Sequence, residues 1–253
     1  MIRYPLLLCL FVSLFSITTP YTYTSSQDAP IKVIFDTDMG SDCDDVGALA
    51  LLHYYADREM AEIIGCVYSS GKVPYGAAVV EAINVYYGRS DIPVGASHDE
   101  IVGDPVDKMQ AEKFARDRAA YRHSIVHNSD ALEMTSLNRR LLAAQPDGSV
   151  TYITVGHTKG LHDLLVSSPD DISSLSGEEL IRKKISRWVA LGALGAMNPQ
   201  NQFAKDWNFF RNGTAPYTSK LIKRFPAPAY FIDAGSDVMT GRALKLTPPG
   251  NIV

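Results

Sequence analysis

The chain alternates between short runs of apolar residues and stretches in which apolar residues recur at helical spacing. Short apolar runs rich in β-branched residues are typical of strands buried on both faces of a parallel sheet. They occupy residues 31–35, 63–67, 92–95, 150–155, 185–191 and 229–232. Helical spacing follows from residue 44 onward and over 77–87, 131–144, 161–166 and 218–224. This alternation predicts an α/β fold: one domain with a doubly wound, mostly parallel sheet flanked by helices.

The polar region 98–128 has no clear period, so we expect loop and short helix there.

The amino terminus has a different pattern. Arg3 precedes an apolar run over residues 5–17, and a polar stretch follows as far as Pro30. This order is typical of a secretory signal, and the run is short for a membrane span of about 20 residues. We therefore predict a signal peptide and leader over 1–28, an α/β domain over 29–253, and export to the periplasm or medium with no stable membrane span after cleavage. An uncleaved membrane anchor is the alternative.

Composition adds few constraints. The 253 residues are 46% apolar and 21% charged, with a net charge of −4. These values fit an ordinary globular domain and give no electrostatic signature of nucleic-acid binding. Lys183 and Lys184 are expected on a solvated helix face, and Cys43 and Cys66 as free thiols. Because residues 250–253 close no helix or strand, we expect either an extended tail or a domain truncated at this end.

The most informative segment joins the first strand to the first helix. It gathers five aspartates: Asp36, Asp38, Asp42, Asp44 and Asp45. Carboxylates this close repel one another and raise the pKa of at least one member of the group. A hard divalent ion, which takes oxygen ligands, would relieve that repulsion. The segment therefore predicts a metal–carboxylate site at the end of a strand.

The aspartates have three other interpretations. Phe35-Asp-Thr-Asp38 resembles the start of haloacid-dehalogenase-type phosphotransferases, although Gly40 stands where those enzymes have Thr or Val. An EF-hand fails because its twelfth position would be Gly47 rather than a bidentate Glu. Helix capping explains Asp44 and Asp45 but leaves unexplained the two aspartates that follow a buried strand.

The acidic segment also resembles the amino-terminal fingerprint of the inosine–uridine-preferring nucleoside hydrolase family. The stretch Asp36-Thr-Asp-Met-Gly-Ser-Asp-Cys-Asp-Asp45 matches a longer variant of that family's Asp-x-Asp-Pro-Gly-x-Asp-Asp-Ala motif. Further resemblance follows in family order at Val155-Gly156, at Asp206-Trp-Asn-Phe209 and at Phe231-Ile-Asp233. The resemblance implies a nucleoside hydrolase-like fold that spans most of residues 31–245.

The resemblance implies a calcium-dependent hydrolase that cleaves the N-glycosidic bond of ribonucleosides or related N-ribosides. The ion would be held by Asp38, Asp45, the Val155 carbonyl and Asp233, and Asp38 would take the proton of the attacking water. Ribose hydroxyls would contact a second group of side chains, namely Asp44, Asp206 and Asn208. Asp36 and Asp42 would orient the loop around the ion. The partner is then a small-molecule nucleoside, with self-association into a homo-oligomer left open.

The sequence departs from that family at the proton donor. Purine-selective members place a His just before the last metal aspartate, and this chain has Ile232 there. The family's Val-Gly-Asn is replaced by residues 69–72, so one ribose contact is lost or replaced. Substitute acids are sought among His123, His127 and His157, and His157 is favoured because it follows Val155. Residues that could stack on a base are Trp207, Tyr121 and Phe210. A nucleoside- or sugar-binding protein that has lost turnover is the second hypothesis.

Overall fold

The computed structural model describes residues 29–40, 43–108, 110–193, 206–232 and 246. The signal peptide predicted over 1–28 lies outside the described residues, as do Asp42, Asp233 and the end of the chain. The predictions made for them therefore stay predictions.

The described residues form one seven-stranded sheet in which every neighbouring pair of strands is parallel. The strands are β1 Ile31–Thr37, β2 Ala61–Tyr68, β3 Val94–Ala96, β4 Leu132–Glu133, β5 Val150–Thr154, β6 Ile185–Leu191 and β7 Ala229–Ile232. The predicted α/β fold and its six strands are confirmed, with small shifts at the ends. Only β4 was not predicted, because two residues are too few to show a period.

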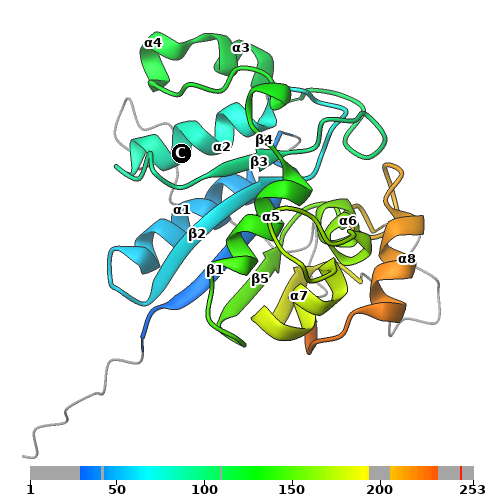
Figure 1. The fold of residues 1–253 in the computed structure, drawn as a ribbon. Coiled ribbons are helices and arrows are strands. Elements are labelled where there is room, and N and C mark those ends of the chain that lie inside the picture. Colours follow the sequence, from blue (N-terminus) through cyan, green and yellow to red (C-terminus); the bar gives the residue numbers. More distant parts are fainter. Residues whose placement is uncertain (1–28, 41–42, 109, 194–205, 233–245, 247–253) are drawn as a thin grey trace, which may run out of the picture.

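Helices connect the strands and cover both faces of the sheet (Figure 1). They are α1 Asp44–Ala56, α2 Gly76–Tyr86, α3 Ala111–Arg116, α4 Arg118–Tyr121, the 3₁₀ turn η1 Asn128–Asp130, α5 Met134–Ala143, α6 Lys159–Val166, α7 Gly177–Lys184 and α8 Ala215–Arg224. The sequence analysis missed α7, although it begins with a capping box between Ser176 and Glu179. As expected, Lys183 and Lys184 belong to a helix.

Two hydrophobic cores lie on opposite faces of the sheet. Side chains of β1 alternate between them, so that Val33 and Phe35 pack with α1 and α2 while Ile34 packs with α5, α6 and α7. Helices cover both faces of β1, and this explains why the first residues of its sequence form an unbroken apolar run. The same alternation directs Asp36 to the face of α6, where Gly160 leaves room for its carboxyl group.

The strand order, β4-β3-β2-β1-β5-β6-β7, reverses direction at β1. The chain first builds outward from β1 to β4 and then returns to place β5 on the other side of β1. In open parallel sheets, ligands bind in the crevice at the carboxyl ends of the strands where the order reverses. Here that crevice lies between the ends of β1 and β5, where the Val155 amide donates to the Asp36 carbonyl over 2.9 Å.

Two further findings concern the described residues alone. None of the helices in these ranges is long and apolar enough to cross a membrane. Both cysteines of the described domain, the exposed Cys43 and the buried Cys66, are free thiols, as predicted.

Candidate functional site

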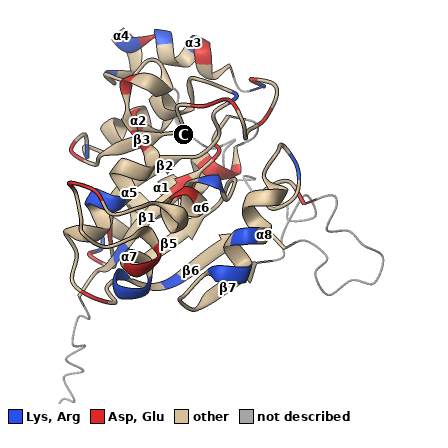
Figure 2. Ribbon diagram, turned by 45° about the vertical axis from the view of Figure 1, so that its right-hand side comes forward, with Lys and Arg blue, Asp and Glu red and all other residues tan. Residues whose placement is uncertain are grey.

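Three aspartates from the acidic segment lie buried at the end of β1 and the start of α1. Exposure is 0% for Asp36, 6% for Asp38 and 3% for Asp45. Acidic segments gather near the starts of α1 and α6 in Figure 2. Gly156, after β5, lies so close that a Cβ there would stand 2.3 Å from the Asp38 amide nitrogen. The sequence therefore brings the ends of β1 and β5 into direct contact around these carboxyl groups.

Asp36 is held by hydroxyl groups from two other segments, Tyr152 in β5 and Ser69 just after β2. The Tyr152 hydroxyl, from β5, donates to Asp36 Oδ2 over 3.0 Å, and Asn138 Nδ2 donates to that hydroxyl oxygen over 3.2 Å. Burial raises the pKa of Asp36 to about 8, although hydrogen bonds from Ser69 and Tyr152 oppose the rise. The Asp36 carboxyl group is therefore enclosed by the protein and has no exposed surface.

Asp38 and Asp45 behave as a pair. Burial alone would raise the pKa of Asp38, but the charge of His157 and hydrogen bonds with His157 and Asp45 hold that pKa below its ordinary value. Burial raises the pKa of Asp45 well above its ordinary value, and the negative charges of Asp38 and Asp44 add to the rise. Of the two, Asp38 is thus the carboxylate that stays ionised and can accept a proton.

His157 follows β5 and is fully buried beside Asp38. Its Nδ1 lies 2.8 Å from Asp38 Oδ2. The two atoms are close enough for an ion pair. On the other side of the ring, Asn212 Nδ2 lies 3.3 Å from His157 Nε2. Ser69 donates to the backbone carbonyl of His157 over 2.9 Å, which fixes the residue from β2.

The segment Asp206–Phe209 also lies at this edge of the sheet. Asn208 Nδ2 donates to the carbonyl oxygens of Val155 and Leu191, over 2.7 and 3.1 Å, and so ties the ends of β5 and β6 together. Asp206 is buried, and its Oδ1 accepts the Phe209 amide over 2.6 Å. Both side chains therefore shape the turn. Asn208 in addition contacts the carbonyl that the sequence analysis assigned to a metal.

The remaining predicted residues differ in their positions. Asp44 begins α1 and is exposed next to Asp45. His123 is buried against the Ala115 carbonyl, and His127 is an exposed cap of η1, so neither contacts the buried aspartates. Tyr121 stacks on Phe114 at the end of α3, with ring centroids 3.7 Å apart, which places it in a different aromatic contact.

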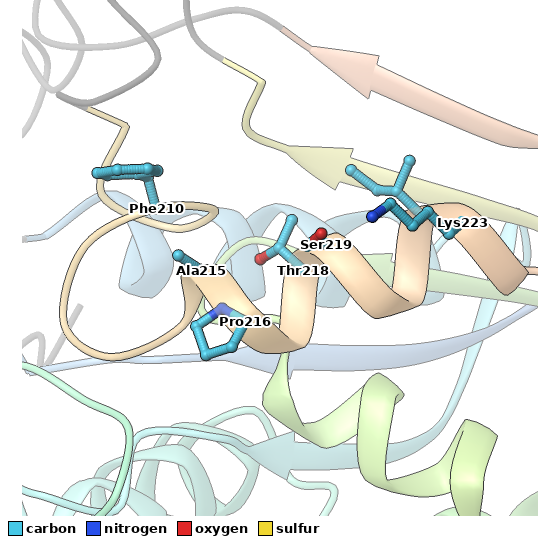
Figure 3. Close-up of a pocket in the computed structure, with 7 residues that line it drawn as sticks. Phe210, Ala215, Pro216, Thr218, Ser219 and Lys223 are labelled. Atoms are coloured by element: carbon cyan, nitrogen blue, oxygen red, sulfur yellow. The ribbon is translucent and has the colours of Figure 1, made fainter.

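Trp207 and Phe210 lie on either side of Asn208 and Phe209. The Trp207 ring is flanked by Lys108 Nζ at 5.1 Å and the Arg211 guanidinium at 5.9 Å from its centroid. Phe210 instead lines a surface groove of about 530 Å³ along α8, together with Ala215, Pro216, Thr218, Ser219, Ile222 and Lys223 (Figure 3). None of the predicted metal or ribose ligands lines this groove, so the groove is distinct from the carboxylate site.

Within the described ranges, Asp36 Oδ1 and Asp45 Oδ1 are buried without a hydrogen-bond partner. A buried carboxyl group in that state is tolerated when it is protonated, as the raised pKa values of both aspartates indicate, or when a cation neutralises it. No three His, Cys, Asp or Glu side chains among the described residues converge as a complete ligand set, and the third predicted carboxylate, Asp233, lies outside them. The donor chemistry thus fits a hard cation, with Asp38, Asp45 and the Val155 carbonyl available to it.

Several residues that build the site escaped the sequence analysis. They are the polar partners of the acidic residues: Tyr152, Asn138 and Asn212. Ser69 was noted only as a changed ribose contact, and it instead supports Asp36 and His157. The sequence carries no clear signal for them, because Tyr152 shares β5 with two other hydroxyl-bearing residues, Thr151 and Thr154.

Comparison with known proteins relates the chain to others through its fold. No protein-family model and no curated protein matches the sequence. The effector protein XOO4466 matches with a TM-score of 0.57 and 14% identity, over 80% of this chain and 55% of that one. The type III effector XopQ, solved in complex with adenosine diphosphate ribose, matches with a TM-score of 0.58 and 15% identity, over 80% and 56%. The plant nucleoside hydrolase PpNRh1 aligns with a TM-score of 0.48 and 18% identity, over 80% and 59%.

The effector structures share the fold of this chain at low sequence identity. The chain spans little more than half of the length of each solved structure it matches. The predicted fold class is therefore confirmed, while membership of the inosine–uridine-preferring family stays a prediction that depends on the motifs.

Proposed function

We propose that this protein is a hydrolase that cleaves the N-glycosidic bond of ribonucleosides or related N-ribosides. The observation that carries the proposal is the buried group Asp36, Asp38 and Asp45 in the crevice between β1 and β5, where folds of this class bind ligands. These aspartates belong to a motif that resembles the nucleoside hydrolase fingerprint. The other segments of that resemblance, Val155-Gly156 and Asp206–Phe209, lie at the same edge of the sheet.

We propose calcium as the cofactor, held by Asp38, Asp45 and the Val155 carbonyl, with Asp233 completing the set. Burial, together with the negative charges of Asp38 and Asp44, raises the pKa of Asp45, and Asp45 Oδ1 has no hydrogen-bond partner. A bound cation would offset that burial and repulsion and would give the oxygen a partner, which supports this assignment. When bound, such an ion lowers the pKa of a water molecule and so supplies the nucleophile at neutral pH.

The side chains then have separate tasks. Asp38 accepts the proton of the attacking water, and the adjacent His157 keeps that carboxylate charged and oriented. Asp44, Asp206 and Asn208 bind ribose hydroxyls. As the C–N bond breaks, positive charge develops on the sugar, and the surrounding carboxylates stabilise it. XopQ was solved with a molecule that contains ribose, which supports riboside binding by this fold.

Two rival functions make different predictions. A haloacid-dehalogenase-type phosphatase needs an accessible carboxylate after the first strand, whereas Asp36 is fully buried and bound by Tyr152. A sugar- or nucleoside-binding protein without turnover would keep the same carboxylates. It is distinguished by tight nucleoside binding without release of base.

The decisive experiment combines a calcium titration with a panel of nucleosides, analysed for free base and ribose. The wild-type protein should hydrolyse at least one N-riboside in a calcium-dependent way. Asp38→Ala should lower kcat by about 100-fold or more, because it removes the base and a metal ligand. Asp91→Asn, at an exposed turn far from the carboxylates in sequence, is the matched control and should keep full activity. Normal turnover by Asp38→Ala would refute the assignment of the base.

Export remains part of the proposal, with cleavage of a signal within residues 1–28. Sequencing the amino terminus of the mature protein, recovered from outside the cytoplasm, tests it. An intact Met1 would contradict it.

A further inference from the structure

Helix α1 is apolar on both of its faces. Residues 46–56 contain no Asp, Glu, Lys or Arg. Leu49 is buried in the core between α1 and the sheet, whereas Leu51 and Tyr54 on the opposite face of the helix are 51% and 47% exposed. A helix that is apolar all round is normally covered on all sides. Among the described residues, the outer face of α1 is therefore left without the cover that such a helix normally has.

The exposed residues of this outer face form one stripe with the spacing of a seam between two helices. They are Asp44, Gly47, Leu51, Tyr54 and Arg58, separated in turn by three, four, three and four residues. In coiled coils this spacing forms the line along which two helices touch. Arg58 follows the end of α1, and its guanidinium carbon lies 3.5 Å from the centroid of the Tyr54 ring. The stripe therefore extends from the first turn of α1 to Arg58.

The two ends of the stripe carry opposite charges. Asp44 and Arg58 are both exposed, and neither forms a salt bridge with another described residue. Asp57, the acidic neighbour of Arg58, pairs instead with Arg89 over 2.6 Å. The stripe is thus acidic at its start, apolar in its middle and basic at its end, which makes it complementary to a reversed copy of itself.

A second copy of α1 in antiparallel orientation matches these charges. Leu51 lies midway between Asp44 and Arg58, which are about 21 Å apart along a helix that rises 1.5 Å per residue. A two-fold axis through Leu51 therefore brings Asp44 of each copy beside Arg58 of the other copy, as a symmetric interface requires. The antiparallel helix dipoles add to the attraction.

The same axis also matches large side chains with small ones. Tyr55 of one copy faces Gly47 of the other, and Tyr54 faces Ala48, because each pair is symmetric about Leu51. The surface at Gly47 is open, since a Cβ there would meet nothing within 4 Å. Small residues opposite rings allow two helices to approach to the usual 8–10 Å between their axes.

We propose that α1 pairs with α1 of a second copy of this chain, antiparallel about Leu51, to form a two-fold symmetric dimer. One pair of helices buries little surface compared with stable complexes, so we expect a dissociation constant in the micromolar range. The pairing does not depend on the proposed hydrolase activity. Asp44 has two carboxylate oxygens, and contact with Arg58 leaves one of them for the ribose hydroxyl proposed above.

The first test is sedimentation velocity of the purified mature protein from about 1 to about 200 µM, the range in which so small an interface should dissociate. The wild-type protein should change from monomer to dimer. Leu51→Glu brings two carboxylates together on the axis and should raise the dissociation constant by about 30-fold or more, the effect expected at the centre of an interface. Ile222→Glu is the matched control, because Ile222 is an exposed apolar residue of another helix, α8, and it should leave the dissociation constant unchanged.

The second test concerns the charges at the ends of the stripe. Arg58→Glu and Asp44→Arg each replace an attraction with a repulsion and should raise the dissociation constant by about 5-fold, the size expected of exposed ion pairs. The double variant should recover most of that loss, because the charges are then exchanged. Added salt should weaken the wild-type dimer through screening.

The third test needs no loss of stability. In a protein that carries Cys9→Ser and Cys43→Ser, Leu51→Cys places two thiols on the axis, where facing Cα atoms are close enough for a disulfide. Mild oxidation should then give a covalent dimer, whereas Ile222→Cys in the same background should stay monomeric.

The outcomes decide the proposal. A wild-type protein that stays monomeric throughout the range overturns it, and so does a dimer that forms equally well in Leu51→Glu. A dimer that dissociates in Ile222→Glu would place the interface along α8 and overturn the pairing of α1. If Leu51→Glu does not fold, the absence of a covalent dimer in Leu51→Cys overturns the proposal, and its formation supports it.

Discussion

At the scale of single residues, the best-defined feature is the support of a buried carboxyl group by hydroxyl groups. Asp36 has no exposed surface, and Tyr152 reaches it from the neighbouring strand β5 while Asn138 supports Tyr152 from α5. Burying a carboxyl group is tolerated only when its oxygens find such partners. The chain of three side chains therefore joins the acidic motif to the helix layer behind it.

Removing one hydroxyl tests this arrangement. Tyr152→Phe keeps the ring and deletes the group that donates to Asp36 and accepts from Asn138. We expect the free energy of unfolding to fall by about 1–3 kcal/mol, since a buried polar atom is left without its partner on each side. Urea unfolding measures the change. Tyr54→Phe, on the exposed face of α1, is the control and should change stability little, and an equal loss in both variants would contradict the argument.

Sequence reasoning placed Asp36, Asp38 and Asp45 correctly at the carboxyl end of the first strand, because an apolar run followed by acids is a local signal. It did not find Tyr152 or Asn138. Their role depends on the register that sets Tyr152 beside Ile34, between segments more than a hundred residues apart. The local sequence pattern of a strand does not show which residues of a distant strand it pairs with.

At the scale of elements, the carboxyl-terminal ends of α1 and α2 are joined by a buried polar contact. His53 Nε2 lies 3.0 Å from Asn84 Oδ1, and its ring stacks on Tyr87 with centroids 4.5 Å apart. Arg89 approaches the other ring nitrogen at 3.3 Å. Burial lowers the pKa of His53 to about 4, against 6.5 for the ordinary side chain, and the Arg89 charge also lowers it.

This contact predicts acid sensitivity with a definite sign. The folded state binds fewer protons at His53 than the unfolded state, so its contribution is fully present above pH 6.5. That contribution is lost as the pH falls toward 4, by up to about 3 kcal/mol over the 2.5 pH units between the two pKa values. His53→Gln, which cannot titrate, should have a shallower fall of unfolding free energy between pH 7 and pH 4.5.

Urea unfolding at both pH values measures the effect, with His127→Gln as the exposed control. Equal pH slopes in His53→Gln and in the wild-type protein would show that His53 is not responsible.

Element prediction succeeded where the pattern was long and failed where it was short. The strands around residues 31–35 and 185–191 were found because buried strands give continuous apolar runs. β4 has only two residues, and the sequence analysis included them in the predicted helix over 131–144. α7 was missed because its pattern is dominated by charged residues, although its capping box was readable.

At the scale of the whole molecule, two hydrophobic cores share one sheet. Trp188 belongs to the core under α5–α8 and Cys66 to the core under α1 and α2, and β1 contributes to both. Because the central strand packs on both sides, loss of one core should remove the support of the other. A single cooperative unfolding transition follows.

Two probes test that cooperativity. In a protein that carries Cys9→Ser and Cys43→Ser, Cys66 is the remaining thiol, and it is fully buried. Its reaction with a thiol reagent and the fluorescence change of tryptophan should have the same urea midpoint. Midpoints that differ by more than the error of the fits would mean that the two cores unfold independently.

The alternation of strands and helices predicted the layered sheet, but the spatial order of its strands came from the structure.

That strand order has a consequence for synthesis of the protein. The middle strand leaves the ribosome first, yet one of its two neighbours, paired at Val150–Thr154, is made more than a hundred residues later. Until then the nascent chain carries an open, apolar flank, and such a flank is a template for intermolecular aggregation. We therefore expect the newborn polypeptide to need chaperone protection for longer than a protein of equal size built from neighbouring hairpins.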